Sequence, residues 1–291
     1  MSWRGGCDSG AALRVQLGTV LDGDEPVWLD LRDTAYGGHG CHGLLVGSGS
    51  GAAQLWQSMV MSLARTYSPE ALRMWLVLPG LESPEHAERT VEAVLAELPL
   101  PADQQEMMRK GAAYQRRWGE EVLLLSALPH VENVIGTPEG GAWDAQRLRQ
   151  CLHNEIDRRT TVLYEANCAD RADFLARHGQ DSAVLPALMV WVDGFLGLIR
   201  ADPRIELDLR RVAAVGRALG IHLMLGTGKF DAVAASSCCQ LVNFRIVFQA
   251  DCSTDLSYAL GRDVVRLPGP EIGYLQRPGE LVGFRRIGNS P

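Results

Sequence analysis

One short segment near residue 50 constrains the fold of this chain more than any other. The apolar run Gly43 to Val46 is followed by a stretch of glycine and serine, 47–51, and then by residues 54–67, whose apolar side chains recur at helical spacing. The run predicts a buried strand, and the spacing predicts a helix packed beside it. A strand, a tight glycine loop and a helix in this order form a cradle in which backbone N–H groups and a helix N-terminus bind phosphate.

The loop departs from the phosphate-binding pattern G-x-x-x-x-G-K-[ST] at the positions that do chemistry. Gly51 fits the last glycine, but Ala52 stands in place of the lysine and Ala53 in place of the magnesium-binding hydroxyl. The first glycine fits only if the loop is one residue shorter than the pattern. A nucleotide bound here would contact Gly47, Ser48, Gly49, Ser50, Gly51, Ala52 and Ala53.

The rest of the chain predicts an α/β fold. Residues 13–30 predict a β-hairpin, and apolar runs predict strands over 74–78, 123–125, 131–135, 188–192, 221–225 and 243–248. Helical segments, among them 143–163 and 207–219, separate the later strands. Apolar strands that alternate with helices imply a mainly parallel sheet covered by helices on both faces.

The run 188–192 ends at Asp193, which supplies a second half to the predicted site. In nucleotide-hydrolysing proteins with this kind of loop, an acidic residue at the end of such a strand holds Mg²⁺. Asp193 is therefore the candidate metal ligand if Mg²⁺ is bound. Its value comes from its pairing with the loop, since many strands end in aspartate. Related ATPases often place a glutamate next, to polarise the attacking water, but this chain has Gly194.

Composition restricts the partners. The net charge is −7, which argues against broad electrostatic binding to DNA or to an anionic membrane. The chain has no apolar run of about 18 residues, so we expect no membrane span. The first ten residues lack the apolar core of a signal peptide, so we expect a cytoplasmic protein.

Cysteine and histidine give no clear metal site. The seven cysteines are odd in number and form no C-x-x-C pair, so we interpret them as reduced thiols. His39 and His42 lie close together, but no carboxylate or thiol accompanies them at matching spacing. We therefore interpret this stretch as a glycine-rich loop and predict no metal site apart from Asp193.

Several short motifs, taken in order, resemble the FtsK/SpoIIIE-type ATPases, and within them the ATPase domains of the type VII secretion protein EccC. Each motif is modest alone, but the ordered set is specific and spans roughly residues 13–285. The motifs are 27–31 and 42–46 before the loop, then 67–72, 128–131, 155–159, 188–193 and 215–222. The resemblance implies a RecA-like P-loop NTPase fold, with ATP and Mg²⁺ as the cofactors. It also implies one domain over 13–288, and the glycine- and serine-rich start of the chain predicts a disordered segment, 1–12.

The departures from this resemblance concern the catalytic parts. Besides Ala52, Ala53 and Gly194, the polar sensor of the family falls at Gly228, and an arginine near the last helix falls at Ser257. Residues 81–122 look like a helical insertion. Because electrostatic stabilisation is usually the largest catalytic contribution, losing the lysine, the hydroxyl and the glutamate together should abolish useful hydrolysis.

The sequence raises three possible functions. The first is a catalytically degenerate ATPase domain, with weak or no nucleotide binding, that binds a protein partner. That partner would be a secreted helical substrate or an active ATPase of the same kind, in a homo- or hetero-oligomer associated with a membrane secretion complex. The second is an active ATP-driven translocase subunit with displaced catalytic groups, such as Lys229. The third, a hydrolase using Ser48 or Ser50, fails because neither serine sits in a G-x-S-x-G elbow.

Three further expectations concern single side chains. Arg217 is a candidate for an arginine that acts on a neighbouring subunit, or else a solvated cation at the end of its helix. Residues 157–159 are expected to form an exposed helix face. Trp56 is expected either to pack in the core or to cover the nucleotide pocket.

Overall fold

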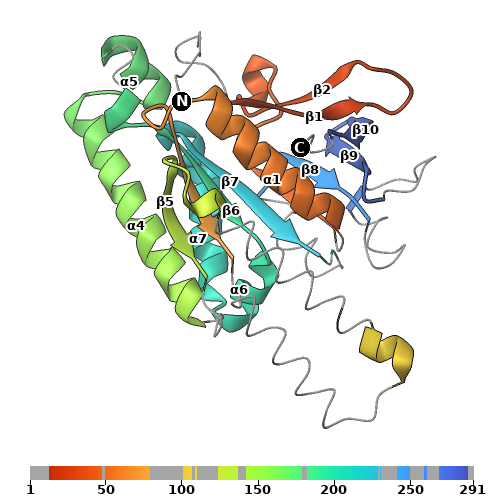
Figure 1. Ribbon diagram of the computed structural model, residues 1–291. Helices are drawn as coiled ribbons and strands as arrows, with labels where there is room; N and C mark the ends of the chain where they lie inside the picture. Colours follow the sequence, from red (N-terminus) through yellow and green to blue (C-terminus); the bar gives the residue numbers. More distant parts are fainter. Residues whose placement is uncertain are drawn as a thin grey trace.

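The centre of the molecule is one ten-stranded sheet (Figure 1). The structure, a computed structural model, describes residues 13–47, 50–78, 101–106, 109, 124–136, 142–178, 182–228, 230, 241–249, 259–260 and 269–287. The strands are β1 (Arg14–Val20), β2 (Pro26–Asp30), β3 (Gly43–Val46), β4 (Leu72–Val77), β5 (Val131–Ile135), β6 (Ala187–Val192), β7 (Ile221–Thr227), β8 (Phe244–Val247), β9 (Ile272–Arg277) and β10 (Glu280–Arg286). Their order across the sheet is β2-β1-β10-β9-β8-β3-β7-β6-β4-β5.

The sheet has a parallel part and an antiparallel part. Strands β8, β3, β7, β6, β4 and β5 are paired in parallel. Strands β9, β10, β1 and β2 extend the sheet with antiparallel pairing. The predicted parallel sheet and the predicted hairpin β1–β2 are therefore confirmed. The pairing of that hairpin with β10, from the other end of the chain, was not predicted.

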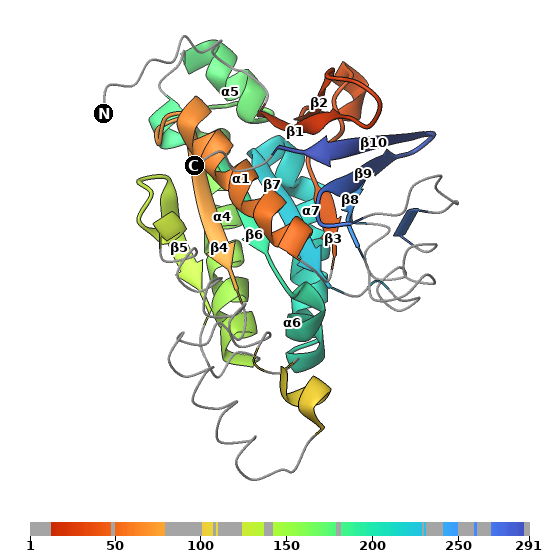
Figure 2. The same cartoon turned by 45° about the vertical axis from the view of Figure 1, so that its right-hand side comes forward.

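Helices cover both faces of the parallel part, as Figures 1 and 2 show from two directions. Helix α1 (Ser50–Thr66) lies on one face. Helices α4 (Ala142–Glu165), α6 (Phe195–Ala201) and α7 (Arg204–Leu219) lie on the other, with α5 (Arg171–His178) beside them. Alternate strand residues enter opposite cores: Leu44 and Val46 pack with α4, α6 and α7, whereas Leu45 packs with α1. The predicted α/β fold class is confirmed.

Two short 3₁₀ helices, η1 (Thr34–Tyr36) and η2 (Ser182–Val184), complete the described elements. Most of the predicted insertion, 81–122, and the whole of the predicted disordered segment, 1–12, lie outside the described residues. Within the insertion, residues 102–106 are helical. The predicted domain boundaries therefore stay predictions.

The strand predicted over 123–125 is wrong. Residues 124–126 form a helical turn, which the Leu128 N–H closes by donating to the Leu125 carbonyl at 3.1 Å. Leu125 is buried and Leu124 is exposed. A run of three leucines suits a buried strand and a single helical turn equally well, so periodicity could not separate the two.

The expected exposed face of α4 is wrong at Arg159, whose side chain is 1% exposed. Its guanidinium pairs with Glu155 at 2.6 Å and donates to the carbonyls of Pro186 and Leu219, each at 2.8 Å. Leu219 ends α7, so its carbonyl has no partner within the helix. Arg159 is buried because it satisfies carbonyls that two neighbouring elements leave unpaired. Asp157 and Arg158, by contrast, are exposed as expected.

Candidate functional site

A cavity of about 260 Å³ lies between α1 and the carboxyl ends of β3, β6 and β7, and we call it the loop cavity. The segment from β3 into α1 contributes Leu45, Gly47, Ala52, Ala53 and Trp56. The end of β6 contributes Trp191, Val192, Asp193 and Gly194, and β7 with its following residue contributes Met224, Leu225, Gly226, Thr227 and Gly228. The carboxyl ends of parallel strands are where α/β sheets bind ligands.

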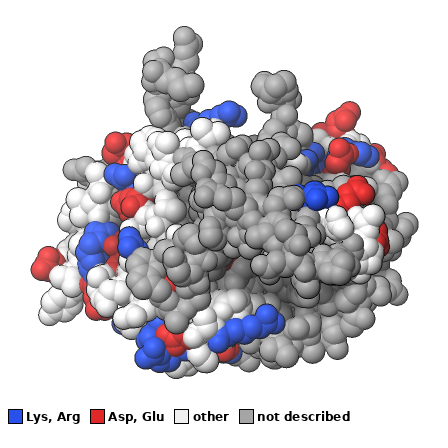
Figure 3. All heavy atoms as spheres, turned by 60° about the horizontal axis from the view of Figure 1, so that its bottom comes forward, with Lys and Arg blue, Asp and Glu red and all other residues white. Residues whose placement is uncertain are grey.

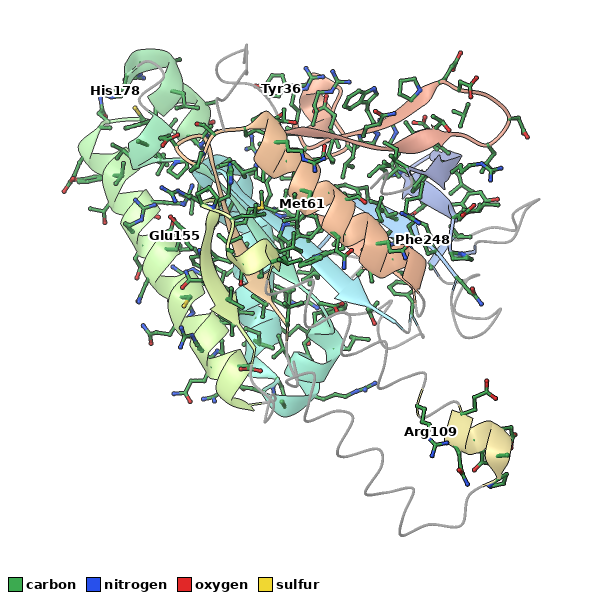
Figure 4. All side chains as sticks on the ribbon, in the orientation of Figure 1. Tyr36, Met61, Arg109, Glu155, His178 and Phe248 are labelled. Atoms are coloured by element: carbon green, nitrogen blue, oxygen red, sulfur yellow. The ribbon has the colours of Figure 1, made fainter. Side chains whose placement is uncertain are left out.

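The structure brings most of the predicted loop residues to this cavity. Gly47 follows β3 and donates its N–H to the Thr227 carbonyl at 3.0 Å. Ser50 begins α1, and Gly51 and Ala52 are buried in its first turn. Ser48 and Gly49 lie outside the described residues. Phe248, labelled in Figure 4 near the start of α1, packs against the loop at Gly47. A Cβ added to Gly47 would lie 3.1 Å from the Phe248 Cβ.

Asp193 is the one charged side chain among the described residues that line the loop cavity. Its Oδ1 accepts a hydrogen bond from the Gly194 N–H at 3.0 Å. Burial raises the pKa of this carboxyl above its ordinary value, and the hydrogen bond from Gly194 opposes that shift. The carboxylate lies over Gly226, where an added Cβ would come within 2.7 Å of Oδ1. No ion pair joins Asp193 to a described cation.

The backbone conformation at Gly194 also favours glycine over the expected glutamate. It precedes α6 with φ 62° and ψ 29°, in the left-handed region. Residues with a Cβ adopt this region at a cost, and glycine does not. The buried Phe195 and Leu198 fix the start of α6, so the turn cannot easily relax. A glutamate here would have to accept a strained backbone.

Two tryptophans form an apolar wall of the loop cavity. The rings of Trp56 and Trp191 meet edge to face, with centroids 5.7 Å apart and planes at 78°. Trp191 is 1% exposed, and its indole N–H has no hydrogen-bond partner among the described residues. Both expectations for Trp56 hold in part, because it packs in the core and also lines the cavity. Sequence reasoning missed Trp191, although its place two residues before Asp193 puts both on one face of β6.

Arg217 does not join the loop cavity. It lies in the last turn of α7, 57% exposed, and pairs with Asp33 at 3.2 Å. The chain then enters β7 at Ile221, and Thr227 at the far end of that strand lines the cavity. Six residues of strand span roughly 20 Å. A role for Arg217 toward a neighbouring subunit stays a prediction. Lys229 and Ser257 lie outside the described residues.

The two histidines before β3 act as hydrogen-bond partners of the backbone. His39 Nδ1 accepts from the Asp30 N–H at 3.1 Å, and His42 Nδ1 accepts from the Leu223 N–H at 3.0 Å. Within the described ranges, no group of three or more His, Cys, Asp or Glu side chains is placed to hold a metal ion. Burial lowers the pKa of His42 to about 4 and that of nearby His222 to about 3.

The strand order, the loop between β3 and α1 and the acidic end of β6 define a domain of the P-loop ATPase fold. Searching protein-family models gives no match. The similarity to individual proteins is nevertheless extended, and it is to EccC. The chain is 28% identical over 280 residues to the ESX secretion system protein EccC of Thermomonospora curvata, covering 94% of this chain and 18% of the relative. It is also 28% identical over 280 residues to the ESX-4 secretion system protein EccC4 of Mycobacterium tuberculosis, covering 94% and 20%.

Solved structures of EccC and EssC also resemble this chain. The cytoplasmic domain of the type VII secretion ATPase EccC from Thermomonospora curvata superposes with a TM-score of 0.75 at 26% identity, over 98% of this chain and 29% of that chain. ATPases 2 and 3 of EssC from Geobacillus thermodenitrificans share the fold, with a TM-score of 0.66 at 15% identity over 97% and 46%. The predicted resemblance to EccC ATPase domains is confirmed. The chain spans about a fifth of the length of the curated relatives it matches.

Two surface properties bear on partners. Across the described part of the chain, no helix has both the length and the apolar character needed to cross a membrane. Figure 3 views the face at the bottom of Figure 1, and there blue and red side chains lie next to each other around the described rim. Among the described side chains of that face, the two signs of charge are therefore mixed.

Proposed function

We propose that this chain is a catalytically degenerate EccC-like ATPase domain that acts as a protein-binding or regulatory module in type VII secretion. The observation that carries the proposal is the composition of the loop cavity. Where the fold would place phosphates, the described walls present Ala52, Ala53, two tryptophans and one carboxylate, with no cation. The nucleotide-binding residues proposed from the sequence are thus a vestige of the site, and weak or no nucleotide binding is expected.

Electrostatics supports this proposal. In an intact P-loop site, the lysine and Mg²⁺ neutralise the charge of the β- and γ-phosphates. Here a polyphosphate would meet the carboxylate of Asp193 instead, without a described cation to offset the repulsion. The hydroxyl that binds Mg²⁺ is replaced by the methyl group of Ala53. The described residues therefore do not fit Mg·ATP, and we assign no catalytic step to them.

The partner is proposed from the relatives. Thermomonospora curvata EccC, as ATPases 2 and 3, has been solved in complex with a signal sequence peptide, and that structure shares the fold of this chain with a TM-score of 0.58 at 19% identity. By analogy, we propose a secreted helical substrate or an active ATPase domain of the same kind as the partner. The chain would then act on the cytoplasmic side of a membrane secretion complex.

Calorimetric titration with ATP and Mg²⁺, together with a hydrolysis assay, tests this proposal. We expect no turnover and no binding tighter than the millimolar range. The matched variant Ala52→Lys/Ala53→Ser restores the two missing side chains and should gain affinity for Mg·ATP if the loop backbone keeps its cradle. A gain in the variant together with weak binding by the natural sequence would locate the defect at these two positions.

The alternative, an active translocase subunit, makes the opposite prediction. It requires steady Mg·ATP turnover by the natural sequence, and loss of that turnover in Asp193→Ala. Such a result would overturn the degenerate assignment and direct attention to Lys229 as the displaced cation. Micromolar ATP binding without turnover would instead indicate a subunit that nucleotide stabilises but does not drive.

A further inference from the structure

The loop cavity contains a charge without a described counter-charge. Asp193 is surrounded by the ends of β6 and β7, and the Gly194 N–H is the hydrogen-bond donor that the structure gives its carboxylate. A carboxylate in an apolar surrounding is costly unless a cation or several donors accompany it. The described residues that line the cavity include neither lysine nor arginine. A positive group would therefore complement the described walls of the site.

The walls of the loop cavity suit the rest of such a ligand. Trp56 and Trp191 line the cavity with their indole rings, and Leu45 and Met224 add aliphatic surface. Indole is the ring that attracts cations most strongly, and aromatic walls recognise ammonium groups on ligands. An ammonium carried on an apolar stem can bury its stem against these walls while its head reaches a carboxylate.

The volume restricts the choice further. At about 260 Å³, the cavity lies just below the range of roughly 300–1,000 Å³ that is usual for pockets that bind drug-sized molecules or cofactors. A bare metal ion would leave most of it empty, and the structure gives it one carboxylate. A single amino-acid side chain is of the right order. Ala52 also stands where the pattern has a lysine, so the long side chain of that lysine does not occupy the cavity.

We propose that the loop cavity binds an ammonium group on an apolar stem, supplied from outside the chain, with Asp193 as its counter-ion and Trp56 and Trp191 as its walls. The proposal rests on the proposed function to the extent that nucleotide leaves the cavity free. Two sources share this chemistry, a free alkylamine and the side chain of a lysine on a partner protein. In both, the external group takes the place of the cation that the loop lacks.

The test is a titration of the full chain, followed by ligand-observed NMR or calorimetry. The probes are n-butylammonium with 1-butanol as its neutral match, and N-acetyl-lysine amide with N-acetyl-norleucine amide as its neutral match. We expect each ammonium to bind at least tenfold tighter than its neutral match. Binding of both ammonium probes points to a lysine side chain, whereas binding of butylammonium alone points to a free amine. Equal affinity for charged and neutral probes overturns the proposal.

Variants separate the charge from the walls. Asp193→Asn should weaken butylammonium at least tenfold and leave 1-butanol within twofold, and Asp157→Asn, on an exposed aspartate of α4, should change neither. Trp56→Leu should weaken butylammonium by roughly three- to thirtyfold, as expected for loss of a cation–π contact. Near-ultraviolet circular dichroism of each variant checks that the fold is kept. If Asp193→Asn is folded and binds butylammonium unchanged, the assignment of the counter-ion is wrong.

Two controls distinguish this proposal from a cation supplied by the chain itself and from nucleotide binding. Lys229→Met removes the lysine that follows the cavity residue Gly228. Ammonium binding that occurs only in this variant would show that Lys229 fills the cavity in the natural sequence. That result would overturn the proposal that the cation comes from outside the chain. Titration of butylammonium with and without Mg·ATP separates the two proposals. If ATP binds tightly and butylammonium still binds in its absence, the expectation of weak nucleotide binding fails while the ammonium site stands.

Discussion

The two ends of the parallel strands differ in what their polar residues do. At the carboxyl ends, alanines, glycines and tryptophans line the loop cavity, and Asp193 is the one charged side chain on its described walls. At the amino ends, polar side chains are buried and paired: Arg159 with Glu155, and His130 with the Tyr67 carbonyl at 2.8 Å. Most of the motifs that carry the resemblance to EccC lie at this second end. They work there as structural anchors.

Under the proposed function, this difference would explain how the chain keeps the fold without the chemistry. An anchor such as Arg159 bonds to the backbone of two other elements, so its loss would leave buried groups unpaired. A side chain such as the P-loop lysine projects toward a ligand, and its loss removes no contact within the protein. Similarity to an ATPase can therefore persist at one end of the sheet even where side chains at the other end are replaced.

The largest expected effect comes from breaking an anchor. Glu155→Ala would leave the Arg159 guanidinium buried without its carboxylate, and removing one partner of a buried pair typically destabilises by roughly 3–5 kcal/mol. Urea denaturation measures the change in the free energy of unfolding. The matched control is Arg158→Ala, which removes the more exposed partner of the same glutamate and should cost less than about 1 kcal/mol. Equal effects would refute the role of the Glu155–Arg159 pair as a buried anchor.

A pH dependence should come from the same end. Burial lowers the pKa of His222 to about 3, with His42, Arg171 and Arg159 adding smaller repulsion and a backbone hydrogen bond at Cys41 opposing the shift. The unfolded chain takes up the proton near pH 6.5, so it binds more protons than the folded chain below that pH. Stability is therefore present above pH 6.5 and falls as the pH drops toward 3.

Between pH 7 and pH 4.5, His222 alone should account for about 2–3 kcal/mol of lost stability. The measurement is the free energy of unfolding of the natural sequence and of His222→Gln at both pH values. The difference between the two proteins should shrink as the pH falls. A difference that does not change with pH would show that this histidine is not kept neutral by the fold.

A smaller effect is expected at the cavity end, from its backbone. Gly194→Ala should destabilise by about 1–2 kcal/mol, because alanine at φ 62° is in the left-handed region. Gly197→Ala is the control within the same helix, since an added Cβ there meets nothing within 4 Å. It should stabilise by about 0.5–1 kcal/mol. Thermal unfolding of both variants shows whether the two changes have opposite signs.

The smallest effect is expected at Arg217. Its ion pair with Asp33 is half-exposed, so Arg217→Ala should change the stability of the isolated chain by less than about 1 kcal/mol. The same variant should leave ligand binding in the loop cavity unchanged. The informative readout is ATP hydrolysis by an EccC-type partner mixed with the chain. A drop in that activity, with stability unchanged, would support an arginine acting across a subunit boundary.

The sequence predicted the parallel core well because its strands are almost wholly apolar and its helices have clear spacing. The pairing β1–β10 escaped prediction, since it joins residues far apart in sequence and no local pattern records it. The burial of Arg159 was also not predicted, because it depends on the carbonyls of Pro186 and Leu219, which belong to other parts of the chain. At the site, the loop and Asp193 were found by motif. Trp191 was missed because its apolar character suits a core position equally well, and its shared strand face with Asp193 is the one local signal of the cavity.

The antiparallel pairing of β1 with β10 has a mechanical consequence. Gly18 lies opposite Arg286, and Val20 lies opposite Phe284, so the start of β1 and the end of β10 point to the same end of their ladder. Tension applied through the two ends of the domain would load these hydrogen bonds one after another, as in a zipper. Strands pulled from opposite ends of a ladder share the load and resist together. A single-molecule pulling experiment should therefore find that the N-terminal hairpin detaches at low force, before the parallel core opens.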